Sequence, residues 1–186
     1  MTIFVGGVVA VLLGLSRGGS FDSLARTRLR TGYLVIAGLV LQVSFAIFTP
    51  GWLTSASALA IVLVSNGLIL AFIVLNRILP GMMVIGAGVL LNVAVIASNG
   101  AMPVSIDAIR VAGIGRVPDE SSLKHEMLGP DSTLPWLGDV IPLPKLQEIV
   151  SVGDLVIVLG IGLLVYRRMN AEHEERAQIS ESPVGR

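Results

Sequence analysis

Five apolar stretches, each long or nearly long enough to cross a lipid bilayer, constrain the fold of this chain more than any other feature. A helix crosses the hydrocarbon layer with roughly 20 mainly apolar residues. Hydrophobic residues make up 53% of the 186 residues and charged residues only 14%, which is more apolar surface than a soluble domain of this size can bury. We therefore predict an all-α integral membrane protein, a bundle of five transmembrane helices. The predicted spans are Thr2–Leu15, Gly32–Phe48, Ser57–Leu75, Leu79–Ala97 and Ile149–Tyr166.

The distribution of lysine and arginine predicts the orientation of the spans, because cytoplasmic loops carry an excess of basic residues. One side receives nine basic residues and the other four, so the N-terminus is predicted outside and the C-terminus in the cytoplasm. Arginine follows the first apolar stretch and does not precede it, which favours a retained anchor over a cleaved signal peptide. The nine are Arg17, Arg26, Arg28, Arg30, Arg77, Arg167, Arg168, Arg176 and Arg186, and the four are Arg110, Arg116, Lys124 and Lys145.

The spans divide the chain into four parts. Residues 1–98 are predicted to form a four-span membrane region, residues 99–151 an extracytoplasmic segment, residues 152–168 the fifth span, and residues 169–186 a cytoplasmic tail that first continues the helix. Long structureless loops are unusual in compact proteins. We therefore expect the extracytoplasmic segment to be ordered.

Within this segment the pattern predicts two short helices and a lid. Val104–Val111 has apolar residues at helical spacing. Asp119 is a suitable N-cap for a second helix, Glu120–Leu128, which the following Gly-Pro pair closes. Leu134–Pro144 is apolar but contains three prolines, which exclude a regular helix. We predict that this run packs over the outer ends of the spans as a lid.

Polar side chains inside the spans are candidates for function, because burying them in lipid is costly. Asp154 lies about one turn inside the fifth span. Two interpretations stay open: Asp154, or Ser151, caps the helix N-terminus, or Asp154 is a buried functional carboxylate that accepts hydrogen bonds from the Ser151 hydroxyl, the Asn99 side chain and amides of the lid. Asn92 shares a helix face with Asn99 and would face Asp154 only if spans four and five adjoin. Gln42, Ser65 and Asn66 are interpreted as hydrogen-bonding groups between spans.

No cofactor or metal site is predicted. The chain has no cysteine, which excludes disulfides, thiolate metal ligands and a cysteine nucleophile. His125 stands among scattered carboxylates without partners at the spacing of a metal site. Lysine plus arginine and aspartate plus glutamate both total 13, so the charge balance does not favour nucleic-acid binding.

The extracytoplasmic segment and the start of the fifth span contain several specific short runs. They are Asn99-Gly100-Ala101-Met102-Pro103-Val104, then His125, then Trp136-Leu137-Gly138-Asp139-Val140-Ile141-Pro142-Leu143-Pro144, then Ser151-Val152-Gly153-Asp154. With these runs the chain resembles a family of small bacterial multi-pass membrane proteins of unknown function. The resemblance covers the chain from the second span to the fifth. It implies the fold and a location in the bacterial plasma membrane, and it implies no activity.

A second resemblance concerns a pair of aspartates. Leu137-Gly138-Asp139-Val140-Ile141, with Ser151-Val152-Gly153-Asp154 opening an apolar helix, is similar to lipoprotein signal peptidase, in which two aspartates at the outer membrane surface activate a water. The resemblance implies that Asp154 stands where that family has its second catalytic aspartate. The pattern around the family's first aspartate, Asn-x-x-Asp-Arg, does not occur here, so Asp139 or Asp107 would have to supply it. Two carboxyls are the minimum for this chemistry, because one acts as the base while the other holds a proton.

The interpretation that we favour is a non-enzymatic membrane protein that binds membrane lipids, another membrane protein or an envelope component through its extracytoplasmic segment. No complete catalytic set is present and no charged residue lies mid-membrane. One alternative is an aspartyl-type intramembrane hydrolase that uses Asp154 with Asp139 or Asp107. Another is a small transporter or channel subunit lined by Asn66, Asn76 and Asn92. The candidate binding residues are Asn92, Asn99, Met102, Pro103, His125, Trp136 and Ser151.

Overall fold

The chain is mostly helical in a computed structural model that describes residues 2–17, 19–48, 53–115 and 125–181. Five long helices account for most of the described residues, and two short helices connect or cover them. The seven α-helices of the described residues are α1 Thr2–Ser16, α2 Phe21–Ala25, α3 Gly32–Ile47, α4 Ser55–Leu75, α5 Met82–Asn99, α6 Ile106–Ala112 and α7 Val152–Glu181.

A small head, residues 100–115 and 125–151, is built between α5 and α7. Besides α6 it contains short strands and one turn of 3-10 helix: β1 Met102–Val104, β2 His125–Met127, η1 Pro135–Leu137, β3 Ile141–Leu143 and β4 Glu148–Val150. Strands β1 and β2 pair in parallel, with Met102 opposite His125. Strands β3 and β4 form an antiparallel hairpin, with Ile141 opposite Val150. A further parallel bridge joins Val104 to Asp139.

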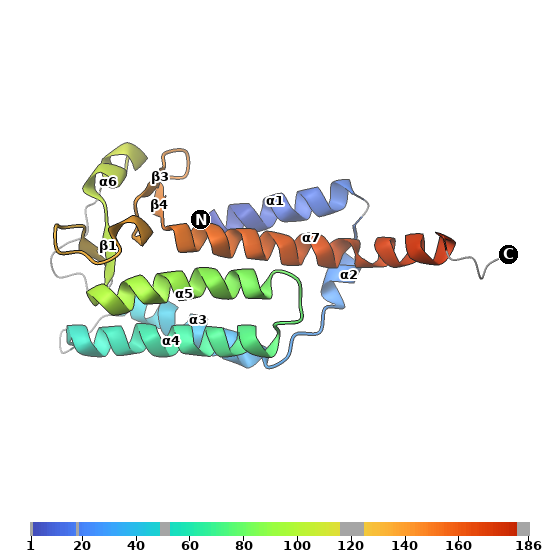
Figure 1. Ribbon diagram of the computed structural model, residues 1–186, viewed down its shortest axis with the longest axis horizontal. Helices are drawn as coiled ribbons and strands as arrows, with labels where there is room; N and C mark the ends of the chain where they lie inside the picture. The colour runs from blue at the N-terminus through green and yellow to red at the C-terminus, as the bar shows by residue number, and fades with distance from the viewer. Residues whose placement is uncertain (1, 18, 49–52, 116–124, 182–186) are drawn as a thin grey trace.

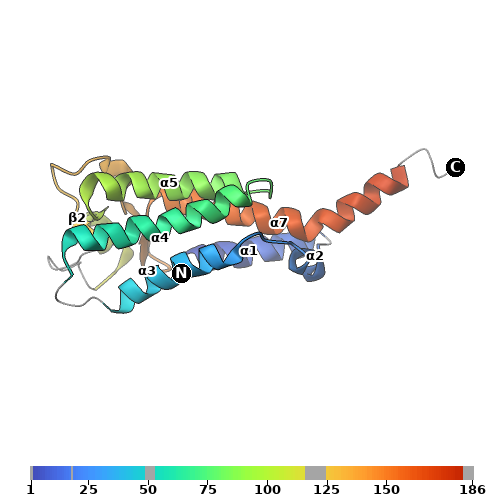
Figure 2. The ribbon, with the colours of Figure 1, turned by 90° about the horizontal axis from the view of Figure 1, so that it is seen from below.

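The long helices lie side by side in an order that differs from the sequence. Helix α1 packs on α7, α7 on α5, α5 on α4, and α4 on α3, while the short α2 docks on α7. Helices α1, α4 and α7 run away from the head, and α3 and α5 run back towards it (Figure 1). The second view shows the head at one end of the helices and the last turns of α7 projecting beyond the other end (Figure 2).

Glycines bring α5 and α7 into close contact. A methyl group added at Gly160 would lie 2.9 Å from the carbonyl oxygen of Gly81, and one added at Gly153 would lie 2.7 Å from the carbonyl oxygen of Gly88. Gly81 and Gly88 are seven residues apart, as are Gly153 and Gly160, so each pair lies on one face of its helix. Small residues of this kind allow two helix backbones to approach closely.

Each of the five predicted spans coincides with a helix. Among the described residues, α4 and α5 are both long enough and apolar enough to cross a membrane, and Gly6–Ser16 and Gly32–Phe45 are shorter apolar helices. Helix α7 begins at Val152 instead of Ile149, because Ile149 pairs with Pro142 in the β3–β4 hairpin. It continues to Glu181, as predicted for the first part of the C-terminal tail.

The segment predicted as a lid contains both buried and exposed residues. Leu137 is buried and packs with Val95 and Met102 in a cluster beneath the head, while Trp136 is 62% exposed. The first predicted short helix is found as α6, which starts two residues late because Val104 belongs to β1. The second, Glu120–Leu128, falls largely outside the described residues. Its last turn is wrong, since residues 125–127 pair with β1 as a strand.

Amide side chains tie the helices together away from the head. Gln42 on α3 donates from Nε2 to the hydroxyl of Ser65 on α4, at 3.3 Å, which confirms the predicted hydrogen bond between these two helices. Asn66 bonds instead within its own helix, to the carbonyl of Val62. Asn76, the C-cap of α4, bonds both the backbone N–H and the carbonyl of Arg30. It therefore fixes the chain that enters α3.

Candidate functional site

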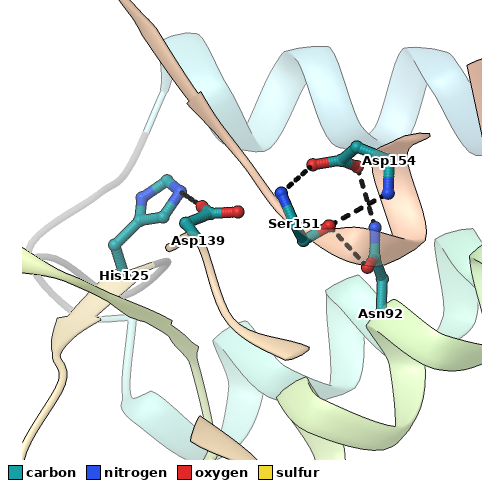
Figure 3. Close-up of polar contacts among 5 residues, drawn as sticks. All are labelled: Asn92, His125, Asp139, Ser151 and Asp154. Carbon is teal, nitrogen blue, oxygen red and sulfur yellow. Dashed lines mark hydrogen bonds and ion pairs between the residues drawn. The ribbon is translucent and has the colours of Figure 1, made fainter. Parts of the chain in front are cut away.

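Strand β1 is flanked by a histidine on one side and by an aspartate on the other. Strand β2 brings His125 to one side through its pairing with β1. On the other side the N–H of Asp139 donates to the carbonyl of Pro103 at 2.8 Å, and the N–H of Ser105 donates to the carbonyl of Asp139 at 3.0 Å. The His125 Nε2 then lies 3.9 Å from the Asp139 Oδ2 (Figure 3).

Two glycines make this arrangement possible. Gly100 ends α5 in the left-handed region, with φ +88°, and its N–H donates to the carbonyl of Ile96, as helix-terminating glycines do. Gly138 passes so close to Pro103 that a side chain there would collide with the Pro103 carbonyl. The Asn-Gly and Gly-Asp runs of the sequence therefore form the turns that position β1 and Asp139 within the head.

Asn99 anchors the lid to the end of α5. Its Nδ2 donates to the carbonyl of Thr133 at 2.9 Å, and its Oδ1 accepts from the N–H of Thr133 at 2.7 Å. This pair of bonds mimics a backbone pairing and fixes the chain just before η1. Its role in the described structure is positional.

A second polar cluster lies at the start of α7. The Ser151 hydroxyl accepts from the N–H of Asp154 at 3.0 Å, and the Asp154 Oδ2 accepts from the N–H of Ser151 at 3.0 Å. This reciprocal pattern is that of a capping box. The Asn92 side chain on α5 completes it: Nδ2 donates to the Asp154 Oδ1 at 2.9 Å, and Oδ1 accepts from the Ser151 hydroxyl at 2.9 Å (Figure 3).

This geometry agrees with the cap interpretation of Asp154, and a functional role for its half-buried carboxylate stays a prediction. Asp154 belongs to the helix cap and also accepts a hydrogen bond from the neighbouring helix. Two of the proposed donors were wrong: the Ser151 hydroxyl donates to Asn92, and Asn99 bonds Thr133. Gly153 explains the close approach, because any side chain there would collide with Asn92.

Asp139 sits in an environment that favours its neutral form. Its side chain is only 14% exposed, whereas that of His125 is 43% exposed. Burial, with a smaller contribution from the negative charge of Asp154, raises the pKa of Asp139 from 3.8 to about 7. Asp139 can therefore exchange a proton near neutral pH, which is a property of many functional carboxyls.

A cavity of about 260 Å³ opens beside Asp139. Its walls combine four apolar side chains with four polar ones, so the cavity is amphipathic. The lining residues are Val104, Ile109, Ile114, His125, Asp139, Gln147, Glu148 and Ile149. Among the described residues no group of three or more carboxylates and histidines is arranged to hold a metal ion.

Comparison with known families bears on the part of the chain that builds this site. A family model described as a family of unknown function, DUF5317, matches residues 26–166. The chain belongs to the DUF5317 family. This confirms the resemblance to an uncharacterised family. No curated protein and no solved structure matches the chain.

The region matched by the DUF5317 family includes every candidate site residue, and the structure distributes these residues over distinct places. His125 and Asp139 line the cavity, and Asn92, Ser151 and Asp154 form the cluster below it. Asp107 lies on the exposed face of α6, 3.4 Å from Arg110. The remaining candidates support the head or lie apart from the cavity: Asn99 anchors the lid, Met102 and Pro103 are buried in β1, and Trp136 is exposed on η1.

Sequence reasoning missed much of the cavity wall in this DUF5317 member. Gln147 and Glu148 reach the cavity from the β3–β4 hairpin, and Ile109 reaches it from α6. The hairpin could have been suspected from the polar turn between two short apolar runs at 141–143 and 149–150. Nothing local in the sequence indicates that this hairpin and α6 face Asp139.

Proposed function

We propose that the chain is a multi-pass protein of the bacterial plasma membrane with α1, α3, α4, α5 and α7 as five transmembrane helices. Three observations support this. Many large apolar side chains are exposed along the helices, among them Leu12, Ile36 and Val43. The helices alternate in direction, and most of the basic residues lie at or beyond the end away from the head. The head is then extracytoplasmic and the C-terminal end of α7 cytoplasmic.

We further propose that the head binds a small amphipathic ligand carrying an ammonium group. The observation that carries this proposal is the cavity beside the buried carboxyl of Asp139. Two carboxyls, Asp139 and Glu148, line the cavity, and its other walls are largely apolar. A cationic group against Asp139 would form a charge-assisted hydrogen bond, while a short apolar body would cover Ile109 and Ile114. The ligand is either a free amine or the exposed end of an envelope component.

A binding experiment in neutral detergent tests this function. Butylammonium is expected to raise the unfolding temperature of the full chain, more at pH 8 than at pH 5.5, because Asp139 is ionised only at the higher pH. Butyrate and butanol, which share the apolar body, should have little effect. The shift should vanish in Asp139→Asn and persist in Glu126→Gln, a matched change on β2 outside the cavity. Equal stabilisation by butanol, or by butylammonium in Asp139→Asn, would contradict the proposal.

A second candidate, the aspartyl-type hydrolase, is favoured by one observation. The charge of Asp154 contributes to the raised pKa of Asp139, and acid–base pairs of carboxyls are recognised by such mutual effects. Against it, both oxygens of Asp154 already accept hydrogen bonds from Asn92 and Ser151. Cleavage of a fluorogenic membrane peptide that is lost in both Asp139→Asn and Asp154→Asn would support the hydrolase; the absence of cleavage by the wild-type chain would reject it for that substrate.

A further inference from the structure

The end of the helices away from the head carries a strongly basic surface. Within residues 16–31, at residue 77 and within residues 166–170 there are seven arginines and one acidic residue, Asp22. Most of these arginine side chains are exposed, and Arg168 is half-buried. We call this set the basic collar: Arg17, Arg26, Arg28, Arg30, Arg77, Arg167 and Arg168.

Part of the basic collar lies at the junction of α2 and α7, and the rest lies along the chain that runs from there to the end of α4. The N–H of Ser20 donates to the carbonyl of Met169 at 3.0 Å, and Gly14 and Gly19 close over the Met169 side chain. Arg17 donates from Nη1 to the hydroxyl of Tyr166 at 3.2 Å. Helix α2 is therefore held against α7 at the level where the apolar part of α7 ends.

From this junction the chain crosses to α4. The side chain of Asn76 accepts from the N–H of Arg30 at 2.8 Å and donates to its carbonyl at 2.9 Å. The segment 26–30 is thus fixed at both ends, by α2 on one side and by the end of α4 on the other. Its alternate arginines are spread across the ends of the helices.

The α2–α7 junction also contains polar atoms that lack partners. Among the described residues, the buried side-chain nitrogen and oxygen atoms without a hydrogen bond are the Thr27 Oγ1, the Arg168 Nε and the Asn170 Oδ1. Asn170 is only 5% exposed, and its Nδ2 already donates to the carbonyl of Tyr166. Buried polar groups are nearly always paired in native proteins. Thr27 follows α2 by two residues, and Arg168 and Asn170 flank Met169, where α2 docks on α7, so the three unpaired atoms belong to segments that meet at this junction.

We propose that the junction of α2 and α7 binds the headgroup of an anionic phospholipid. A lipid phosphate accepts two parallel hydrogen bonds from an arginine such as Arg168, and the Thr27 hydroxyl supplies a third donor. The Asn170 oxygen accepts from a hydroxyl of the headgroup, which phosphatidylglycerol provides. The arginines next to this junction, Arg17, Arg26 and Arg167, add positive charge that attracts the anionic headgroup. This inference rests on the membrane location proposed above and is independent of the ligand of the head.

A different result is expected if the basic collar only sets the orientation of the protein in the membrane and binds no lipid. Orientation depends on the number of basic residues near the ends of the spans, so Arg77 and Arg168 would be equivalent. A built lipid site depends on Arg168, Thr27 and Asn170, and it tolerates the loss of Arg77, which lies at the α4–α5 turn. This difference defines the controls.

The test measures thermal unfolding of the full chain in neutral detergent with short-chain phosphatidylglycerol, short-chain phosphatidylcholine or inorganic phosphate added. Phosphatidylglycerol should raise the unfolding temperature of the wild-type chain by several degrees more than phosphatidylcholine does. Arg168→Gln and Thr27→Val should lose this difference, and Arg77→Gln, which removes the same charge, should keep it. The unfolding temperature without lipid shows whether each variant is folded, and Thr27→Val, which conserves the side-chain shape, keeps the test valid if Arg168→Gln does not fold.

Three results would overturn the lipid site. Equal shifts with phosphatidylglycerol and phosphatidylcholine would show that the anionic headgroup is not recognised. If Arg77→Gln and Arg168→Gln lost the lipid-dependent stabilisation equally, binding would depend only on the number of positive charges in the basic collar. A full shift from inorganic phosphate alone would assign the site to a free anion. None of these results affects the response of the head to butylammonium, so the two proposals fail separately.

Discussion

At the scale of single residues, the protonation of Asp139 links the stability of the head to pH. The pKa of Asp139 is about 7 in the folded chain and 3.8 without burial, so the folded state binds more protons between these values. Stability contributed by the neutral carboxyl is full below about pH 4 and is lost as the pH rises through 7. His125, Glu148 and Asp154 are the other titratable residues near this group.

The replacement Asp139→Asn tests this directly. Because asparagine resembles the neutral carboxyl, the variant should be more stable than the wild type at pH 8, by roughly 4 kcal/mol at most, and similar to it near pH 4. Unfolding in detergent as a function of pH measures the difference, with Glu126→Gln as the control. Parallel stability curves for Asp139→Asn and the wild type would refute the assigned protonation.

A second residue-scale prediction concerns Asp154. Asp154→Leu removes the acceptors of the Asn92 side chain and the Ser151 N–H, and each unpaired donor costs about 1–3 kcal/mol. Asp154→Asn keeps a cap and should cost less, since asparagine caps helices well. Asn66→Leu is the control, because the Asn66 side chain donates to the carbonyl of Val62 in its own helix. If Asp154→Leu unfolds at the wild-type temperature, the cluster at α7 contributes nothing to stability.

The sequence indicated which residues are chemically important, but it did not indicate which residues lie next to them in the fold. Asp154 stands out because a carboxyl is rare inside an apolar span, Asp139 was indicated by the resemblance to signal peptidase, and Ser151 was recognised as a possible cap. The bond from Asn92 depends on the contact between α5 and α7, which sequence reasoning left conditional. Glu148 was overlooked because its position in the cavity depends on a hairpin with no strong local signal.

At the scale of elements, the contact between α5 and α7 rests on glycines. A methyl group at Gly88 would meet the carbonyl of Gly153 and the side chain of Ile157, whereas one at Gly67 on α4 would meet nothing within 4 Å. Gly88→Ala should therefore destabilise the chain by about 1–3 kcal/mol. Gly67→Ala should be neutral or stabilising by roughly 0.5–1 kcal/mol, the usual gain in a helix. Unfolding temperatures in detergent compare the two, and equal effects would contradict the packing described for α5 and α7.

Helices were predicted more reliably than strands for a physical reason. A run such as Ser57–Leu75 is long and predominantly apolar, so its length and composition together indicate a helix. Strands of three residues, such as β1 and β2, are too short to show an alternating pattern, and they exist only because distant segments pair. Val104 and Ile149 were for this reason assigned to the neighbouring helices.

At the scale of the whole molecule, the order α1, α7, α5, α4, α3 brings the last helix between the first and the fourth long one. Basic-residue counts predict the direction of each helix but not its neighbours, since connections as long as residues 100–151 allow many arrangements. The position of the head above α5 and α7 follows from that packing. The proposed location of the head outside the cell and of the basic collar in the cytoplasm requires the two to face opposite sides of a membrane.

Labelling of single cysteines measures this topology most directly, because the natural chain contains no cysteine. Arg110→Cys and Lys145→Cys lie in the head, and Arg77→Cys lies at the opposite end; all three positions are exposed. In intact bacterial cells a membrane-impermeant maleimide should label the two head positions, and Arg77→Cys should react only after the cells are broken. Labelling of Arg77→Cys in intact cells, with the head protected, would contradict an extracytoplasmic head and the functions proposed for it.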